Sequence, residues 1–232
     1  VVGRSLQLVR CCVVLVAGAG PAGVCAAVAA ARAGARVSLA EEQSRFGGSL
    51  LYRDAKVSGE SALDWVNSTG DELRANSNVT LLPRSTVTGY YDHNFLVINE
   101  RRTHHLGPGQ ADPRVSRERL WRVRASQVVL ATGAIERPLV FEGNDVPGVM
   151  LCSAVSTYIR RYAVVPGRRG AVFTNNDSGY QTAVDMAWAG MEVSGVVDLR
   201  SSPSGQAVET VEALGIPVYA GHVVCGTRSN AK

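Results

Sequence analysis

One stretch decides the fold of this chain: Val13-Val14-Leu15-Val16-Ala17-Gly18-Ala19-Gly20-Pro21-Ala22-Gly23. Its first part, Val13–Val16, is apolar and rich in β-branched residues, which predicts a fully buried parallel strand. A Gly-x-Gly-x-x-Gly turn follows. The alanine-rich residues 24–33 then predict a helix, which Gly34 ends. A strand, a glycine turn and a helix in this order indicate a βαβ unit that binds a dinucleotide.

The turn residues each have a physical role in holding such a ligand. Gly18 allows the tight turn, Gly20 lets the backbone approach a pyrophosphate, and Gly23 lets the helix pack closely on the strand. Pro21 falls in the first helical turn, where its missing N–H costs nothing. The helix N-terminus presents free N–H groups and a positive dipole end to the phosphates. The alternative is a glycine turn in an ordinary α/β domain without a ligand.

An acidic residue closes the unit. Residues 36–40 predict the second strand, and Glu41 stands at its carboxyl end, 23 positions after Gly18. A carboxylate at this place can accept hydrogen bonds from an adenosine ribose. It would also repel a 2′-phosphate, so the site should prefer FAD or NAD over NADP.

Length and composition point to a globular protein of one or two domains. The chain has 232 residues, of which 46% are hydrophobic and 19% charged, and a formal net charge of +4. Basic residues are scattered, apart from Arg101–Arg102 and the stretch 114–124. Aromatic residues do not interleave with that stretch as a stacking platform would need, so no nucleic-acid partner is expected.

The five cysteines form neither a Cys-x-x-Cys pair nor a metal-ligand spacing, so neither dithiol exchange nor a metal site is expected. An odd number of cysteines suggests reduced thiols in a cytoplasm. The apolar run near the N-terminus is explained as the first strand rather than a signal peptide, and no stretch has transmembrane length. The chain begins at Val1 and its last residues stop just after a predicted strand, so we expect a piece of a longer polypeptide.

Further segments extend the first unit. The turn Arg45-Phe46-Gly47-Gly48 follows Glu41 closely, as expected of a loop that wraps the far side of a pyrophosphate. Residues 61–75 predict an amphipathic helix with Leu63, Val66 and Leu73 on its apolar side. Residues 79–82 predict the third parallel strand, and Thr86-Val87 would place backbone against an adenine ring.

An antiparallel meander is predicted next. Residues 90–99 and 120–123 alternate apolar and polar side chains, and residues 103–117 form a long exposed loop between them. A separate buried strand, 127–130, then runs into Ala131-Thr132-Gly133-Ala134. Small residues at the carboxyl end of a parallel strand bring the backbone against a cofactor.

A second, altered copy of the βαβ unit follows. Residues 170–174 predict a strand, 181–189 a helix and 193–197 a further strand that ends at Asp198. Between strand and helix, Asn175-Asn176-Asp177-Ser178-Gly179-Tyr180 replaces the glycine turn. Aligned position by position, Asp177 replaces Gly20 and Tyr180 replaces Gly23. A carboxylate in the place of a phosphate and a bulky ring at the helix–strand contact predict that this unit binds NAD(P)H poorly or not at all.

Four longer motifs resemble the alpha subunit of heterotetrameric sarcosine oxidase. They are residues 89–94 (GYYDHN), 131–138 (ATGAIERP), 143–150 (GNDVPGVM) and 173–178 (FTNNDS). The resemblance covers nearly the whole chain after residue 12. It implies an α/β fold of the two-dinucleotide-binding type: a parallel Rossmann-like sheet with a β-meander, then a second, truncated Rossmann-like βαβ domain. The domains expected are 1–164 and 165–232.

The same resemblance implies a cofactor, partners and site residues. Within the alpha subunit the fold would hold NAD, with FAD as the alternative, while a flavin-carrying beta subunit oxidises the amine and other domains of the alpha subunit lie outside this chain. No catalytic residue is expected here, since we find no acid–base pair and no nucleophile arrangement. The residues expected to line the nucleotide site are Gly18, Gly20, Pro21, Ala22, Gly23, Glu41, Glu42, Arg45, Gly47, Gly48, Val87, Ala131, Thr132 and Gly133.

Other functions remain open at this point. Alpha subunits of related opine, proline or amine dehydrogenases share parts of the pattern. A stand-alone FAD-dependent NAD(P)H oxidoreductase is a further alternative, although the missing dithiol and the altered second turn argue against it. A scaffold whose nucleotide is purely structural would differ little from the first possibility if the nucleotide never exchanges hydride.

Overall fold

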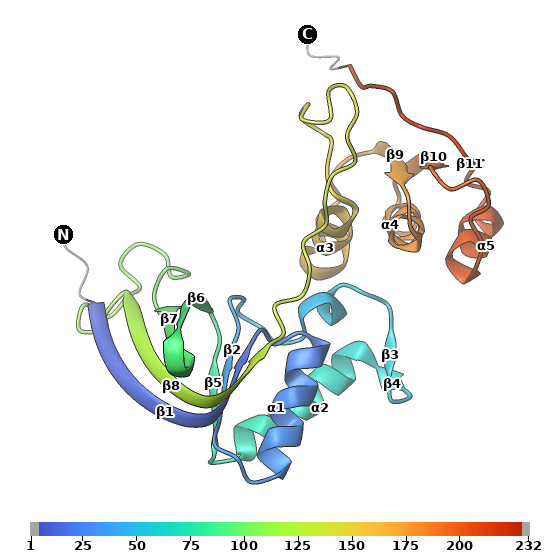
Figure 1. Cartoon of the computed structure of the whole chain (residues 1–232). Coiled ribbons are helices and arrows are strands. Elements are labelled where there is room, and N and C mark those ends of the chain that lie inside the picture. Colours follow the sequence, from blue (N-terminus) through green and yellow to red (C-terminus); the bar gives the residue numbers. More distant parts are fainter. Residues whose placement is uncertain (1–4, 229–232) are drawn as a thin grey trace. The chain divides into compact units, whose positions relative to one another are not determined.

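The computed structural model describes residues 5–228, and the chain divides into two compact units between Ala134 and Ile135 (Figure 1). We call residues up to Ala134 unit 1 and residues from Ile135 on unit 2. Residues 135–164, which were predicted to belong to the first domain, lie in unit 2. They do so because helix α3 (Cys152–Tyr162) packs against helix α4 (Asp177–Trp188).

Unit 1 is built on a six-stranded sheet of order β5-β2-β1-β8-β7-β6. The strands β2, β1 and β8 run parallel, as does β5 beside β2, whereas β7 and β6 add an antiparallel meander. The parallel part and the meander were both predicted. The strand bounds are β1 Ser5–Ala17, β2 Val37–Ala40, β5 Val79–Leu82, β6 Ser85–Tyr91, β7 Phe95–Arg101 and β8 Glu118–Leu130.

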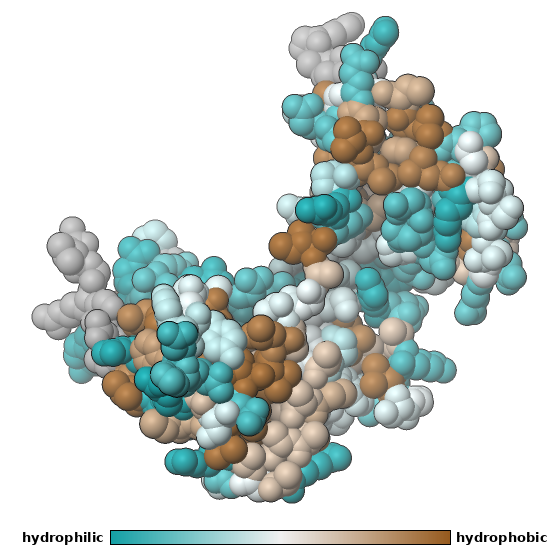
Figure 2. Space-filling view, in the orientation of Figure 1, coloured by the Kyte–Doolittle hydropathy of each residue, from teal (hydrophilic) through white to brown (hydrophobic). Residues whose placement is uncertain are grey.

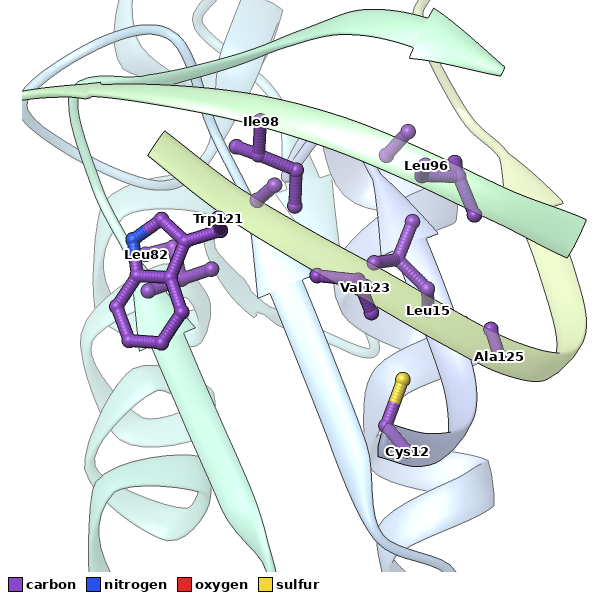
Figure 3. Close-up of a cluster of buried hydrophobic side chains, with 10 residues drawn as sticks. Cys12, Leu15, Leu82, Leu96, Ile98, Trp121, Val123 and Ala125 are labelled. Atoms are coloured by element: carbon purple, nitrogen blue, oxygen red, sulfur yellow. The ribbon is translucent and has the colours of Figure 1, made fainter. Parts of the chain in front are cut away.

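Helices cover one face of this sheet, and the meander closes the other. Helix α1 (Pro21–Arg32) and helix α2 (Ala62–Ala75) bury their apolar sides against β1 and β2. On the opposite face, side chains of β1, β7 and β8 form a second core, with Leu15, Leu96 and Val123 fully buried (Figure 3). The short elements are η1 (Gly48–Leu51), β3 (Lys56–Val57), β4 (Glu60–Ser61) and η2 (Asp92–Asn94).

Several local predictions for unit 1 were wrong. The segments 120–123 and 127–130 belong to one strand, β8, which pairs with β1 along both strands from Ser5 to Ala17. The predicted strand 90–99 is two strands separated by a turn, η2. The two strands predicted to be buried, 13–16 and 127–130, each have an exposed end, since Val13 is 37% and Leu130 62% exposed.

Helix α2 shows why helical spacing decides burial. Its buried residues Ala62, Val66, Gly70 and Leu73 recur every three or four positions, which places them on one side of the helix. Leu63 lies about 100° around the helix from Ala62 and is 46% exposed, so its assignment to the apolar side was wrong.

Unit 2 has a three-stranded parallel sheet of order β11-β10-β9. The predicted second βαβ unit is confirmed as β9–α4–β10, and helix α3 was not predicted. Alternate residues of β9 face the helices, as Val172 does, while Phe173 faces the other way and touches the ring of Phe141. Figure 2 shows hydrophobic residues gathered over β9 and β10, where a groove of about 930 Å³ lies within the unit. The remaining bounds are β9 Arg169–Thr174, β10 Glu192–Asp198, α5 Gln206–Ala213 and β11 Val218–Ala220.

The two leucines of α2 give a matched test of this packing. We expect Leu73→Ala to lower the free energy of unfolding of unit 1 by about 2–5 kcal/mol, because a buried side chain leaves a cavity. Leu63→Ala should change it by no more than about 0.5 kcal/mol. Denaturant titration of both variants measures the difference, and equal costs would contradict the observed orientation of the helix.

Candidate functional site

The glycine turn brings β1, α1 and β8 into direct backbone contact. A Cβ atom on Gly23 would lie 1.8 Å from the carbonyl oxygen of Gly18, and one on Gly18 would lie 2.3 Å from the carbonyl oxygen of Ala131. Gly18 also has φ +96°, which side chains other than glycine rarely adopt. Both glycines are therefore required by the protein's own packing, as predicted for the tight turn and the helix–strand contact.

Gly20 differs from its two neighbours. Its φ is −68°, which any residue can adopt, and a Cβ there would meet no heavy atom of residues 5–228 within 4 Å. Gly20 is the N-cap of α1, with Pro21 at the first helical position, and no described side chain caps this helix end. The amides of Ala22 and Gly23 belong to the first turn, whose N–H groups lack partners within the helix.

Glu41 is fixed against the turn. The side chain is 7% exposed, and its Oε2 accepts a hydrogen bond of 2.7 Å from the backbone N–H of Ala19. Its Oε1 accepts one of 2.9 Å from the N–H of Gln43. Backbone bonds to Leu82 and Ser85 hold the same residue in the sheet. The carboxylate is thus held at the carboxyl end of β2, where the sequence placed it.

A second loop packs on the turn from the other side. The N–H of Gly47 donates to the carbonyl of Ala19 at 2.7 Å. Gly48 has φ +53°, and a Cβ on it would lie 2.8 Å from the Cα of Gly20. Ala19 therefore joins the glycine turn to both Glu41 and the Gly-Gly loop. Sequence reasoning missed this role, and its one signal is that Ala19 occupies the first variable position of the glycine motif.

The other expected site residues have mixed positions. Thr132 follows Ala131 beside the turn, with its Cα 3.3 Å from a Cβ built on Gly18. Gly133 has φ +72° and, within the described chain, open space around it. The side chains of Glu42 and Arg45 are exposed, and Val87 packs against the core of the meander. The structure thus gathers Gly18, Gly20, Pro21, Ala22, Gly23, Glu41, Gly47, Gly48, Ala131 and Thr132 at one edge of the sheet.

The second βαβ unit corrects the alignment made from sequence. Helix α4 begins at Asp177 with Asn176 as its N-cap, so Asn176, not Asp177, is the counterpart of Gly20. A Cβ on Gly179 would lie 2.5 Å from the Thr174 side chain, so Gly179, not Tyr180, is the counterpart of Gly23. Tyr180 does not crowd the contact. It is fully buried in the core, where its hydroxyl donates to Asp198 at 2.8 Å.

Charges at the end of β10 form a closed network. Arg200 donates to Asp198 Oδ2 at 2.8 Å and to Asp177 Oδ1 at 2.8 Å. Burial opposes ionisation of Asp198, but hydrogen bonds from Arg200 outweigh it and lower the pKa of that carboxyl. Burial and the neighbouring Asp198 raise the pKa of the Tyr180 hydroxyl, so it stays protonated and donates.

The structure also describes the cysteines and the potential metal ligands. All five cysteines are free thiols. Between residues 5 and 228 there is no group of three or more potential metal ligands. None of the helices within these residues is long and apolar enough to cross a bilayer.

Comparisons with known proteins agree with this geometry. A family model described as FAD dependent oxidoreductase matches residues 14–93, which contain the glycine turn, Glu41 and Val87. The sarcosine oxidase alpha subunit of Corynebacterium sp. (strain P-1) is 50% identical over 221 residues, which are 94% of this chain and 22% of that protein. The chain is homologous to a segment of the sarcosine oxidase alpha subunits. The resemblance stated from the motifs is confirmed, and the chain spans about a fifth of the length of these relatives.

Two further similarities are more distant. An opine oxidase subunit of Agrobacterium tumefaciens (strain Ach5) is 31% identical over 84% of this chain and 38% of that protein. The crystal structure of L-proline dehydrogenase from P. horikoshii superposes with a TM-score of 0.65 at 23% identity, over 88% of this chain and 38% of that one. This structural likeness shows the fold, a Rossmann-type α/β architecture as predicted.

Cys152, the first residue of α3, shows how the structure affects the reactivity of a thiol. Burial, and after it the charge of Glu136, raises the pKa of Cys152 to about 11, and the Glu136 carboxylate accepts the N–H groups of Cys152 and Ser153. At about pH 8 its thiolate fraction should be roughly a hundredfold below that of an ordinary cysteine.

We therefore expect iodoacetamide to label the exposed Cys25 well before Cys152, as followed by peptide mass spectrometry. Glu136→Gln should speed labelling of Cys152 at the same pH, because one negative charge is removed. Equal labelling rates of Cys25 and Cys152 in the unmodified chain would contradict this assignment.

Proposed function

We propose that unit 1 binds a dinucleotide at the glycine turn, with NAD as the first candidate and FAD as the alternative. The family model and the fold support a dinucleotide, and they leave the choice between the two open. Glu41 disfavours NADP, because its carboxylate lies where a 2′-phosphate would add like charge.

Gly20 is the observation that carries this proposal. Nothing in its backbone angles and nothing in the described protein around it requires a glycine. A glycine that the fold does not need is explained when another molecule must approach its backbone closely. The uncapped N-terminus of α1 beside it offers N–H groups and a positive dipole end to that molecule, and a pyrophosphate fits both features.

The surrounding residues would hold the remaining parts of the ligand. The amides of Ala22 and Gly23 would donate to the pyrophosphate, and Glu41 would accept from the adenosine ribose. The backbone at Val87 would meet the adenine, while the Gly47-Gly48 loop with Arg45 and Glu42 would border the phosphates. Ala131, Thr132 and Gly133 would line the far side of the site. A bound dinucleotide supplies its own redox chemistry, and these residues bind and orient it.

For the longer protein we propose a sarcosine-oxidase-like oxidoreductase acting on a CH–NH bond, of which this chain is the nucleotide-binding segment of the alpha subunit. The 45–50% identity over 94% of the chain supports this choice. The opine oxidase relative keeps related secondary amines open as substrates. A flavin-carrying beta subunit would be the partner, and the free cysteines fit a cytoplasmic location.

A single methyl group tests the site. We expect Gly20→Ala to weaken nucleotide binding at least about tenfold, which corresponds to ~1.4 kcal/mol, because the methyl occupies space the pyrophosphate needs. The melting temperature without ligand should stay close to that of the parent chain, since a Cβ there meets no described neighbour. Isothermal titration with NAD and with FAD measures the first effect, and calorimetric melting the second.

Gly70→Ala is the matched control. Gly70 lies inside α2, and a Cβ there would have its nearest neighbour, the Arg74 side chain, at 3.4 Å. Nucleotide affinity should be unchanged in this variant, because α2 contributes no residue to the site. Unchanged affinity in Gly20→Ala would remove the main support for the proposal.

The identity of the nucleotide and of the reaction needs separate measurements. Mass spectrometry of the ligand released from the purified protein should find NAD. If the released ligand is FAD, with a visible flavin absorption band, FAD replaces NAD in the proposal.

In the longer protein, co-purification with a second flavoprotein and sarcosine-dependent peroxide formation are expected. A complex that lacks peroxide formation with sarcosine but oxidises an opine or proline would reassign the substrate.

A further inference from the structure

The two βαβ units of this chain differ most at the first turn of their helices. In unit 1, α1 starts at a glycine N-cap with no described side-chain cap and no acidic residue in its first turn. In unit 2, the Asn176 side chain accepts from the N–H of Ser178 at 3.0 Å, and Asp177 adds a carboxylate. In unit 2 the chain's own Asn176 oxygen thus bonds a first-turn N–H, and the Asp177 carboxylate adds negative charge at the same helix end.

Arg200 fixes the carboxylate in this place. It lies two residues after Asp198, and its backbone N–H donates to Asp198 Oδ1 at 2.8 Å. Gln43 makes the same backbone bond to Glu41 in unit 1, so Arg200 and Gln43 occupy equivalent positions. From there Arg200 reaches across to Asp177 at the N-terminus of α4.

A buried carboxylate, that of Asp198, holds this arginine in place. The carboxylate of Asp198 is fully buried and receives hydrogen bonds from Tyr180 and from Arg200. Tyr180 comes from α4 and Asp198 from β10, so the network ties the helix to the end of the strand. A guanidinium that faces two carboxylates has no net attraction left for an incoming phosphate.

We propose that unit 2 is a nucleotide-binding fold closed from within: Asn176 and Asp177, the latter held by Arg200, occupy the places that phosphate oxygens would take. Asp177 and Asn176 are then specificity-determining residues that restrict this chain to one nucleotide site. The same arrangement predicts what reopens the fold. Removing both side chains exposes the amides of the α4 first turn and frees one side of Arg200, a combination that favours a phosphate or pyrophosphate group.

The experiment compares the full chain with its Asn176→Gly/Asp177→Ala variant. Hydrogen exchange of amides 176–181, followed by mass spectrometry, is recorded with and without inorganic pyrophosphate. In the parent chain, pyrophosphate should leave exchange at these amides unchanged. In the variant it should slow their exchange several-fold. Asp177→Asn is the second variant, in case the double variant folds poorly. It keeps the Asn176 cap and the side-chain shape but removes the negative charge, so pyrophosphate should slow exchange in it by a smaller factor.

Helix α2 supplies the matched control. Ser61 caps it through the N–H of Asp64, and its hydroxyl donates to the Asp64 carboxylate, so the carboxylate is held by a serine rather than an arginine. Ser61→Gly/Asp64→Ala therefore opens a helix end without an arginine held beside it, and pyrophosphate should not slow exchange there.

Two outcomes would overturn the proposal. If pyrophosphate slows exchange at 176–181 in the parent chain as much as in the variant, the fold is open and Asp177 does not close it. If it slows exchange in neither variant, these side chains are not what excludes the anion. Exchange at α1 is read from separate peptides, so the result stands apart from nucleotide binding in unit 1.

Discussion

Helix α1 can lie on β1 because Gly23 has no side chain. A Cβ there would approach the carbonyl oxygen of Gly18 to 1.8 Å, well inside any possible contact, so every other residue would push the helix away from the strand. That short approach places the N-terminus of α1 directly beyond the end of β1. Within the same turn, the backbone of Ala19 bonds two different partners, the carboxylate of Glu41 and the N–H of Gly47.

The edge of the sheet that carries the candidate nucleotide site is held together by backbone contacts more than by side chains. Three segments far apart in sequence, 18–23, 41–48 and 131–132, meet through carbonyl and amide groups and through glycines that bring main chains together. Glu41 is the one charged side chain fixed among them, and both its oxygens are bonded. A rigid edge of this kind suits a ligand whose phosphates are recognised by amides and whose ribose is recognised by a carboxylate.

Sequence predicted this edge well because its determinants are local. Glycine spacing, the β-branched run and the acid at the end of β2 each act within a few residues of their position. Helix α3 was missed because its Ser, Thr, Val and Tyr residues have weak helix propensity, and packing of Val155 and Ile159 against α4 stabilises it instead. The joining of 120–123 and 127–130 into β8 depends on pairing with β1, more than a hundred residues earlier in the chain, which local alternation does not reveal.

The second copy shows how little separates a binding fold from a closed one. Asn176 stands at the cap where unit 1 has Gly20, and Gly179 keeps the close helix–strand contact that Gly23 makes in unit 1. The topology, the acid at the end of the second strand and the backbone bond two residues beyond it are all retained. What changes is the chemistry at one helix end, from unpaired N–H groups to an amide oxygen, a carboxylate and an arginine. The two units have the same backbone topology but different side chains at the helix N-terminus. Function in this chain must therefore be assigned to each helix end separately rather than to the fold.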